Sequence, residues 1–225
     1  MTTPFPAYDQ VLQALLNASA ETGRAPARLL AVSKTQAPSA IAALAARGQR
    51  AFGENYVQEG MTKAAALAPL GLEWHLIGHL QSNKCREAAE TFDWVQSLDR
   101  AKLIAPLARY RPDGRAPLNI LLQVNVDGEA SKSGCAPADL AALAEAVAAE
   151  PRLRLRGVMA IPEPHPDFAV RRAAFGRVRA LYEALQARHP DLDTLSLGMS
   201  EDYLLAVAEG ATLVCGGGRA ALNTG

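Results

Sequence analysis

The segment LLAVSK, residues 29–34, is the first of eight short apolar segments that decide the fold. It is an apolar run that ends in polar residues, a pattern typical of a strand buried on both faces within a parallel sheet. A segment with helical periodicity precedes it at 8–22, and an Ala-rich helical segment follows it at 39–47. The first fifty residues therefore predict the order helix, strand, helix.

The same alternation continues along the rest of the chain. Seven further segments have strand character: RAFGEN (50–55), EWHLIG (73–78), DWVQSL (93–98), NILLQVNV (119–126), RLRGVMAI (154–161), TLSLGM (194–199) and TLVCGG (212–217). Helices are expected between them, near 55–68, 80–90, 99–109, 137–149, 167–188 and 201–209. Eight strands alternating with helices in 225 residues favour an α/β fold, a closed (β/α)8 TIM barrel with an extra N-terminal helix, over an open doubly wound sheet, because closure removes both sheet edges. We expect residues 1–225 to form a single domain.

Composition excludes several classes of partner. The chain has 23 Lys and Arg and 23 Asp and Glu residues, so it offers no net positive field to nucleic acid or to an anionic membrane surface. No apolar run reaches the length of a membrane span. Cys85, Cys135 and Cys215 form no CxxC pair, which is typical of reduced thiols, and we expect a cytoplasmic protein. His75 and His79 lack the glutamate of a zinc-binding helix, so we expect no metal site.

Lys34 is the most informative polar residue at the carboxyl ends of the strands, where a barrel places its functional site. It shares the alternation of Leu30 and Val32, which would direct its ammonium to the mouth of the barrel. An amine held in a partly desolvated site has a lowered pKa and condenses with aldehydes, so Lys34 is a candidate for Schiff-base formation. From its position alone, Lys34 is equally compatible with a side chain that reaches out to solvent.

The loops after the seventh and eighth strands are SLGMS (196–200) and CGGGR (215–219), and barrels commonly bind phosphate at these two loops. Their glycines would let backbone N–H groups approach an oxyanion closely, and Ser200 could cap the next helix. Each loop alone is typical of an ordinary tight turn, but the two together, opposite a strand-end lysine, indicate an aldehyde that carries a phosphate ester. Arg171 and Arg172 are expected on a solvated helix face.

Several longer segments resemble the pyridoxal-phosphate-binding homeostasis family, which is related to the barrel half of fold-type III enzymes such as alanine racemase. They are LLAVSKTQ around Lys34, FGENYVQE from Phe52, WHLIGHLQSNK from Trp74, VNVDGEASKSGC from Val124, GVMAIP from Gly157 and LSLGMSEDYLLAVAEGAT from Leu195. The resemblance covers most of the chain. It implies a fold-type III barrel without the C-terminal β-domain of the racemases.

The resemblance also implies a cofactor, pyridoxal 5'-phosphate, held through an internal aldimine on Lys34. It implies that Asn55 lies near the cofactor ring. The remaining cofactor-binding residues expected from the resemblance are Ser196, Gly198, Ser200, Gly216, Gly217 and Gly218. One departure concerns the ring nitrogen, because the arginine that approaches it in the family is replaced here by Cys215, with Arg219 four residues later.

Family members are regarded as carriers or regulators of the cofactor pool without established turnover. We therefore expect a monomeric protein of pyridoxal phosphate homeostasis that delivers its cofactor to pyridoxal-phosphate-dependent apoenzymes and has no catalytic residues. The alternative is an enzyme, either a racemase-like pyridoxal enzyme acting on amino acids or a Schiff-base lyase. Racemisation requires an acid or base on each face of the substrate carbon, and in the related racemases one comes from the C-terminal domain, which favours the carrier.

Overall fold

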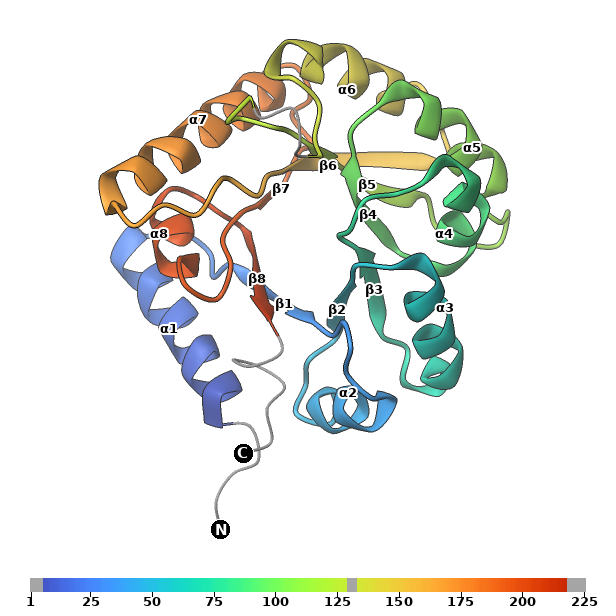
Figure 1. Ribbon diagram of the computed structural model, residues 1–225, viewed down its shortest axis with the longest axis horizontal. Coiled ribbons are helices and arrows are strands. Elements are labelled where there is room, and N and C mark those ends of the chain that lie inside the picture. Colours follow the sequence, from blue (N-terminus) through green and yellow to red (C-terminus); the bar gives the residue numbers. More distant parts are fainter. Residues whose placement is uncertain (1–5, 129–132, 218–225) are drawn as a thin grey trace.

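The eight predicted strands form a closed parallel barrel in chain order (Figure 1). A computed structural model describes residues 6–128 and 133–217. The strands are β1 (Arg28–Val32), β2 (Ala51–Glu54), β3 (Glu73–Leu76), β4 (Trp94–Leu98), β5 (Leu118–Gln123), β6 (Leu153–Met159), β7 (Thr194–Ser196) and β8 (Leu213–Gly217). The closed barrel is confirmed and the open sheet is wrong, whereas a single domain over residues 1–225 stays a prediction.

The helices surround the barrel on its outside (Figure 1). They are α1 (Pro6–Thr22), α2 (Pro38–Ala45), α3 (Val57–Ala66), α4 (Cys85–Thr91), α5 (Ile104–Tyr110), α6 (Leu140–Ala148), α7 (Phe168–Gln186) and α8 (Tyr203–Ala208). Short 3-10 helices are η1 (Ala68–Leu70), η2 (Ser82–Lys84), η3 (Ala101–Leu103) and η4 (Pro137–Asp139). Three of these, η2, η3 and η4, lead directly into α4, α5 and α6, so these α-helices begin later than the sequence predicts.

The N-terminal helix α1 covers the seam where the barrel closes. It packs against α8, and its buried side chains Tyr8, Val11 and Leu15 belong to the core between the helices and the strands. The Tyr8 hydroxyl donates to Gln49, whose amide in turn donates to the carbonyls of Leu29 in β1, at 2.9 Å, and Ala51 in β2, at 2.7 Å. The helix is therefore held by apolar burial and by a buried hydrogen-bond chain to β1 and β2.

Alternation along the strands divides the core into two layers. Leu29 and Ala31 face the helices and join the larger cluster of buried residues. Leu30 instead packs inside the barrel with Ala51 and Leu213, and a second interior cluster contains Trp94, Leu121 and Met159. No helix in the described ranges is long and apolar enough to span a bilayer.

Replacing Gly78 by alanine is expected to destabilise the fold by about 1–3 kcal/mol, the usual cost of overpacking. A Cβ at Gly78 would lie 2.1 Å from the backbone oxygen of Asn55, and neither backbone can shift without moving β2 or β3. Gly114 provides the matched control, because a Cβ there meets nothing within 4 Å. Urea unfolding should show a lower midpoint for Gly78→Ala than for Gly114→Ala, and equal midpoints would contradict the prediction.

Candidate functional site

A cavity of about 690 Å³ opens at the carboxyl ends of the strands. Five of the predicted cofactor-binding residues line it: Lys34, Asn55, Ser196, Gly198 and Ser200. They come from β1, β2 and β7 or from the loops that follow these strands, so the closed barrel brings together residues far apart in the sequence. This cavity is the candidate site.

The three glycines predicted to follow the eighth strand have different outcomes. Gly216 and Gly217 lie within β8 rather than in the loop after it, paired with Ala31 and Val32 of β1. A Cβ at Gly216 would lie 2.8 Å from Leu29 Cδ1, so this glycine allows close packing within the barrel wall. Neither glycine is among the residues that line the cavity. Gly218 and Arg219 lie outside the described residues, and their predicted roles stay predictions.

The backbone on both sides of Lys34 is fixed by one group of charged side chains. The Ser33 hydroxyl donates to Glu54 at 2.5 Å, and the Ser33 carbonyl accepts from Lys63 Nζ at 2.6 Å. Thr35 adopts φ +63°, a left-handed conformation that is uncommon for a β-branched residue, and its N–H donates to Glu59 at 2.6 Å. These contacts hold the turn that presents Lys34.

The centre of this group is a buried ion pair between Lys63 and Glu54. Lys63 Nζ lies 2.8 Å from Glu54 Oε1 and 2.6 Å from Glu59 Oε1, and the Glu54 side chain is 0% exposed. Burial raises the pKa of Glu54, although hydrogen bonds from Lys63 and Ser33 oppose the shift. Since a buried carboxylate needs a counter-charge, Lys63 is the residue that permits Glu54 to anchor the turn.

Lys34 itself lines the cavity but is exposed. This exposure fits the alternative in which the Lys34 side chain reaches out to solvent, and the partly desolvated amine stays a prediction. The physical reason is that β1 ends at Val32, so Lys34 stands in the loop beyond the barrel wall rather than within the packed interior. Lys34 therefore both lines the cavity and is exposed to solvent.

The loop at 196–200 also departs from the prediction in one respect. Helix α8 begins at Tyr203 with Asp202 as its N-cap residue, so Ser200 does not cap it. Asp202 Oδ1 instead accepts from the N–H of Met199 at 2.7 Å, which closes the turn. Gly198 has φ +87°, and a Cβ there would lie 2.6 Å from Ala206 Cβ. Glycine is required because of both its backbone conformation and the close approach of α8.

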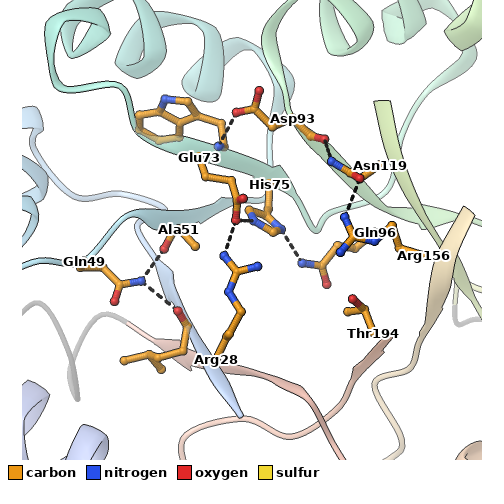
Figure 2. Close-up of polar contacts among 12 residues, drawn as sticks. Arg28, Gln49, Ala51, Glu73, His75, Asp93, Gln96, Asn119, Arg156 and Thr194 are labelled. Carbon is orange, nitrogen blue, oxygen red and sulfur yellow. Dashed lines mark hydrogen bonds and ion pairs between the residues drawn. The ribbon is translucent and has the colours of Figure 1, made fainter. Parts of the chain in front are cut away.

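A column of polar side chains runs through the barrel interior, and Figure 2 shows its part from Arg28 to Gln96. Arg28 donates to Glu73 at 2.6 Å, and His75 Nε2 lies 2.8 Å from the same carboxylate oxygen. Gln96 Nε2 lies 2.9 Å from His75 Nδ1, and the Ser196 hydroxyl donates to Gln96 Oε1 at 2.8 Å. The column therefore ends at Ser196, which is one of the residues that line the cavity.

The charged members of this column are Arg28 and Glu73, which stand at the end farthest from the cavity. Burial lowers the pKa of His75, which keeps the ring neutral, with Nε2 as donor to Glu73 and Nδ1 as acceptor from Gln96. Burial alone would raise the pKa of Glu73, but the hydrogen bond with His75 and the charge of Arg28 lower it to about 2. His75 also stacks on Trp94 at 5.1 Å. The floor of the cavity is therefore polar but uncharged.

Cys215 stands on this floor beside Ser196. Removal from water raises the pKa of its thiol to about 11, and a hydrogen bond with Ser196 acts in the opposite direction. The position that holds an arginine in the resembled family thus carries a neutral thiol here. His79 is exposed, with Nδ1 3.9 Å from Asp99 Oδ2, whereas His75 is fully buried. Within the described ranges, no three His, Cys, Asp or Glu side chains are grouped as metal ligands.

Sequence patterns missed three residues that shape the site: Lys63, Glu59 and Gln96. The spacing of Glu59 and Lys63, four residues apart on α3, is typical of a helical ion pair. No local pattern shows that the pair also reaches Glu54 and the backbone of Ser33. Gln96 carries no motif, and its role follows only from the position of β4 between β3 and β5.

The fold and the cavity together define a class of protein, a parallel eight-stranded barrel with a strand-end lysine that faces a Ser- and Gly-containing loop. Residues 10–217 match the family described as alanine racemase, N-terminal domain. A pyridoxal phosphate homeostasis protein from Pseudomonas aeruginosa is 55% identical over 207 residues, which cover 91% of this chain and 89% of the relative. The protein of that name from Escherichia coli K12 is 48% identical over 210 residues, covering 91% and 90%.

Solved structures lead to the same family. PipY from Synechococcus elongatus, with pyridoxal phosphate bound, has a TM-score of 0.80 and 39% identity, covering 93% of this chain and 99% of that chain. The chain belongs to the pyridoxal phosphate homeostasis protein family, and its barrel is an alanine racemase N-terminal domain. The resemblance drawn from the sequence is confirmed.

Replacing Lys63 by methionine is expected to destabilise the protein by about 3–5 kcal/mol at neutral pH, because Glu54 would be buried without a counter-charge. The folded-state pKa of Glu54 is already raised above its ordinary value of 4.5 and would rise further in the variant. Folded Glu54 then binds more protons than unfolded Glu54, so the stability of the variant falls as the pH rises above about 4.5. Urea unfolding should show a larger loss at pH 8 than at pH 5.

The matched control is the double variant Glu54→Gln with Lys63→Met, which removes the carboxylate together with its partner. We expect it to be more stable at pH 8 than the single variant, with less dependence on pH. A loss in Lys63→Met that is equal at both pH values, or a double variant that is no more stable, would contradict the role given to this ion pair.

Proposed function

We propose that this protein binds pyridoxal 5'-phosphate in the cavity and serves intracellular pyridoxal phosphate homeostasis, with Lys34 as the residue that holds the cofactor covalently. The observation that carries the proposal is that Lys34 lines the same cavity as Ser196, Gly198 and Ser200. The turn that contains Lys34 is held by the hydrogen bonds of Ser33 and Thr35. The names of the relatives and the bound cofactor in PipY support it.

The chemistry of the cavity fits this cofactor. Pyridoxal 5'-phosphate supplies an aldehyde that condenses reversibly with a primary amine, and a phosphate that accepts hydrogen bonds. Lys34 provides the amine, Asn55 an amide, and the 198–200 turn a hydroxyl and backbone groups. A volume of about 690 Å³ lies within the range of small-molecule sites. We assign the phosphate to the 198–200 turn and the ring to the side of Asn55.

Exposure of Lys34 favours a carrier over a catalyst. Enzymes that form reactive intermediates exclude water from the reacting centre. Here Lys34 is an exposed residue, and we propose that free amines and the lysines of acceptor proteins reach the bond that holds the cofactor. We propose that the protein delivers its cofactor to pyridoxal-phosphate-dependent apoenzymes as a monomer in the cytoplasm, without catalytic turnover of its own.

Replacing Lys34 by alanine is expected to abolish covalent retention of the cofactor. Wild-type protein mixed with pyridoxal 5'-phosphate should develop a visible absorption band, and borohydride should fix the cofactor on the peptide that contains Lys34. Lys102, which is exposed at η3, offers a matched control, and Lys102→Ala should behave as wild type. Wild-type protein that yields no modified Lys34 peptide would overturn the proposed function.

Turnover assays distinguish the proposed carrier function from the alternative of an enzyme. Wild-type protein loaded with cofactor should neither racemise amino acids nor cleave phosphorylated sugars at a substantial rate. A rate that is substantial in wild type and disappears in Lys34→Ala would favour the racemase-like or lyase alternative.

Replacing Cys215 by arginine is expected to tighten cofactor binding by about tenfold, the effect of one hydrogen bond to a charged group. The reason is that the neutral thiol cannot supply the cationic contact which family resemblance implies for the ring nitrogen. Cys215→Ala controls for loss of the thiol and should leave the affinity within about twofold of wild type. Equilibrium titration followed by absorbance provides the measurement, and an unchanged affinity in Cys215→Arg would show that this position does not limit binding.

A further inference from the structure

Arg171 stands apart from the other arginines of α7. It lies in the first turn of the helix, is half-buried and lines the same cavity as Lys34. The expectation of a solvated helix face is right for its neighbour Arg172, whose side chain is 65% exposed, and wrong for Arg171. Two consecutive residues of one helix thus face different surroundings, because successive helical positions are about 100° apart.

Arg171 has no ionic partner among residues 6–128 and 133–217, and its Nε is buried without a hydrogen-bond acceptor. The neighbouring arginines on α7 are paired: Arg172 with Glu209 at 2.6 Å, Arg177 with Asp127 at 3.4 Å and Arg179 with Glu183 at 2.7 Å. A buried, unsatisfied donor on a charged group is rare in folded proteins and calls for an acceptor supplied from elsewhere.

The walls around Arg171 are mainly apolar. Ile161, Pro162 and Pro164 line the cavity from the segment after β6, and Phe175 lines it one helical turn beyond Arg171. Two carboxylates also line the cavity, but Asp202 Oδ1 already accepts from the Met199 N–H, and Glu201 is exposed. An oxyanion next to Arg171 would therefore meet a half-buried guanidinium beside mainly apolar side chains, and hydrogen bonds from a charged donor are stronger than those from a neutral one.

We propose that Arg171 is a second anion-binding residue of this cavity and that its guanidinium binds an oxyanion through paired hydrogen bonds. Arginine forms such paired hydrogen bonds with phosphate and carboxylate alike. The identity of the ligand rests on the proposed function. Two sources have the required chemistry: the phosphate of the cofactor, and the carboxylate of an amino acid whose amine takes the cofactor from Lys34.

Binding measurements on Arg171→Gln test this assignment, with Arg172→Gln as the matched control on the same helix. Titrations would use pyridoxal 5'-phosphate, pyridoxal, which lacks the phosphate, and inorganic phosphate and acetate as isolated anions. If the cofactor phosphate is the ligand, Arg171→Gln should bind pyridoxal 5'-phosphate and inorganic phosphate about tenfold or more weakly, with pyridoxal binding unchanged. Arg172→Gln should stay within about twofold of wild type in every titration.

If an amino-acid carboxylate is the ligand, cofactor binding should be unchanged, and cofactor release should respond instead. Glycine and methylamine are the matched probes, because they share a primary amine and differ in the carboxylate. In Arg171→Gln, release by glycine should slow about tenfold, while release by methylamine should not change. Arg171→Lys, which keeps the charge without the paired hydrogen bonds, should fall between wild type and Arg171→Gln.

The assignment is overturned if Arg171→Gln matches Arg172→Gln with every anion and with both amines. Failure of the proposed function is a distinct result. In that case wild-type protein would not retain the cofactor on Lys34, while weaker binding of inorganic phosphate or acetate by Arg171→Gln would still support an anion site at Arg171.

Discussion

The parallel pairing of β8 with β1 is the interaction on which the site depends. Five residue pairs, from Arg28 with Leu213 to Val32 with Gly217, close the barrel and leave no free strand edge at the seam. The same pairing sets Lys34, just beyond β1, in one cavity with Cys215 of β8 and the turn after β7. Without closure, the lysine and the loops assigned to the phosphate would lie at opposite edges of an open sheet.

Two sets of buried polar side chains determine which chemical groups line this cavity. The ion pair of Lys63 and Glu54 holds Ser33 directly, and Glu59 holds the left-handed Thr35, so the turn that carries Lys34 is fixed while Lys34 itself stays exposed. The column from Arg28 to Ser196 keeps its charges at the far end of the barrel and leaves an uncharged floor. Positive charge at the cavity thus comes from its rim, where Lys34 and Arg171 stand.

Hydrophobic periodicity was sufficient for the fold, because each strand and helix buries a face that its own residues specify. The eight strands and eight α-helices found among residues 6–128 and 133–217 were all predicted, and the errors lie at element ends. Helices α4, α5 and α6 begin after 3-10 turns, and α8 begins at Tyr203 rather than near 201. These ends depend on local hydrogen bonds, such as that from the Met199 N–H to Asp202, which periodicity does not contain.

The sequence by itself determined the barrel, the family and the strand-end position of Lys34, because short-range patterns and long matching segments encode them. Only the tertiary structure decided that Lys34 is exposed, that Gly216 packs within the barrel wall, that Gln96 links His75 to Ser196, and that Arg171 faces the cavity while Arg172 faces solvent. The physical reason is that burial and pairing of a polar side chain depend on neighbours contributed by distant strands. No local pattern of residues records which neighbours those are.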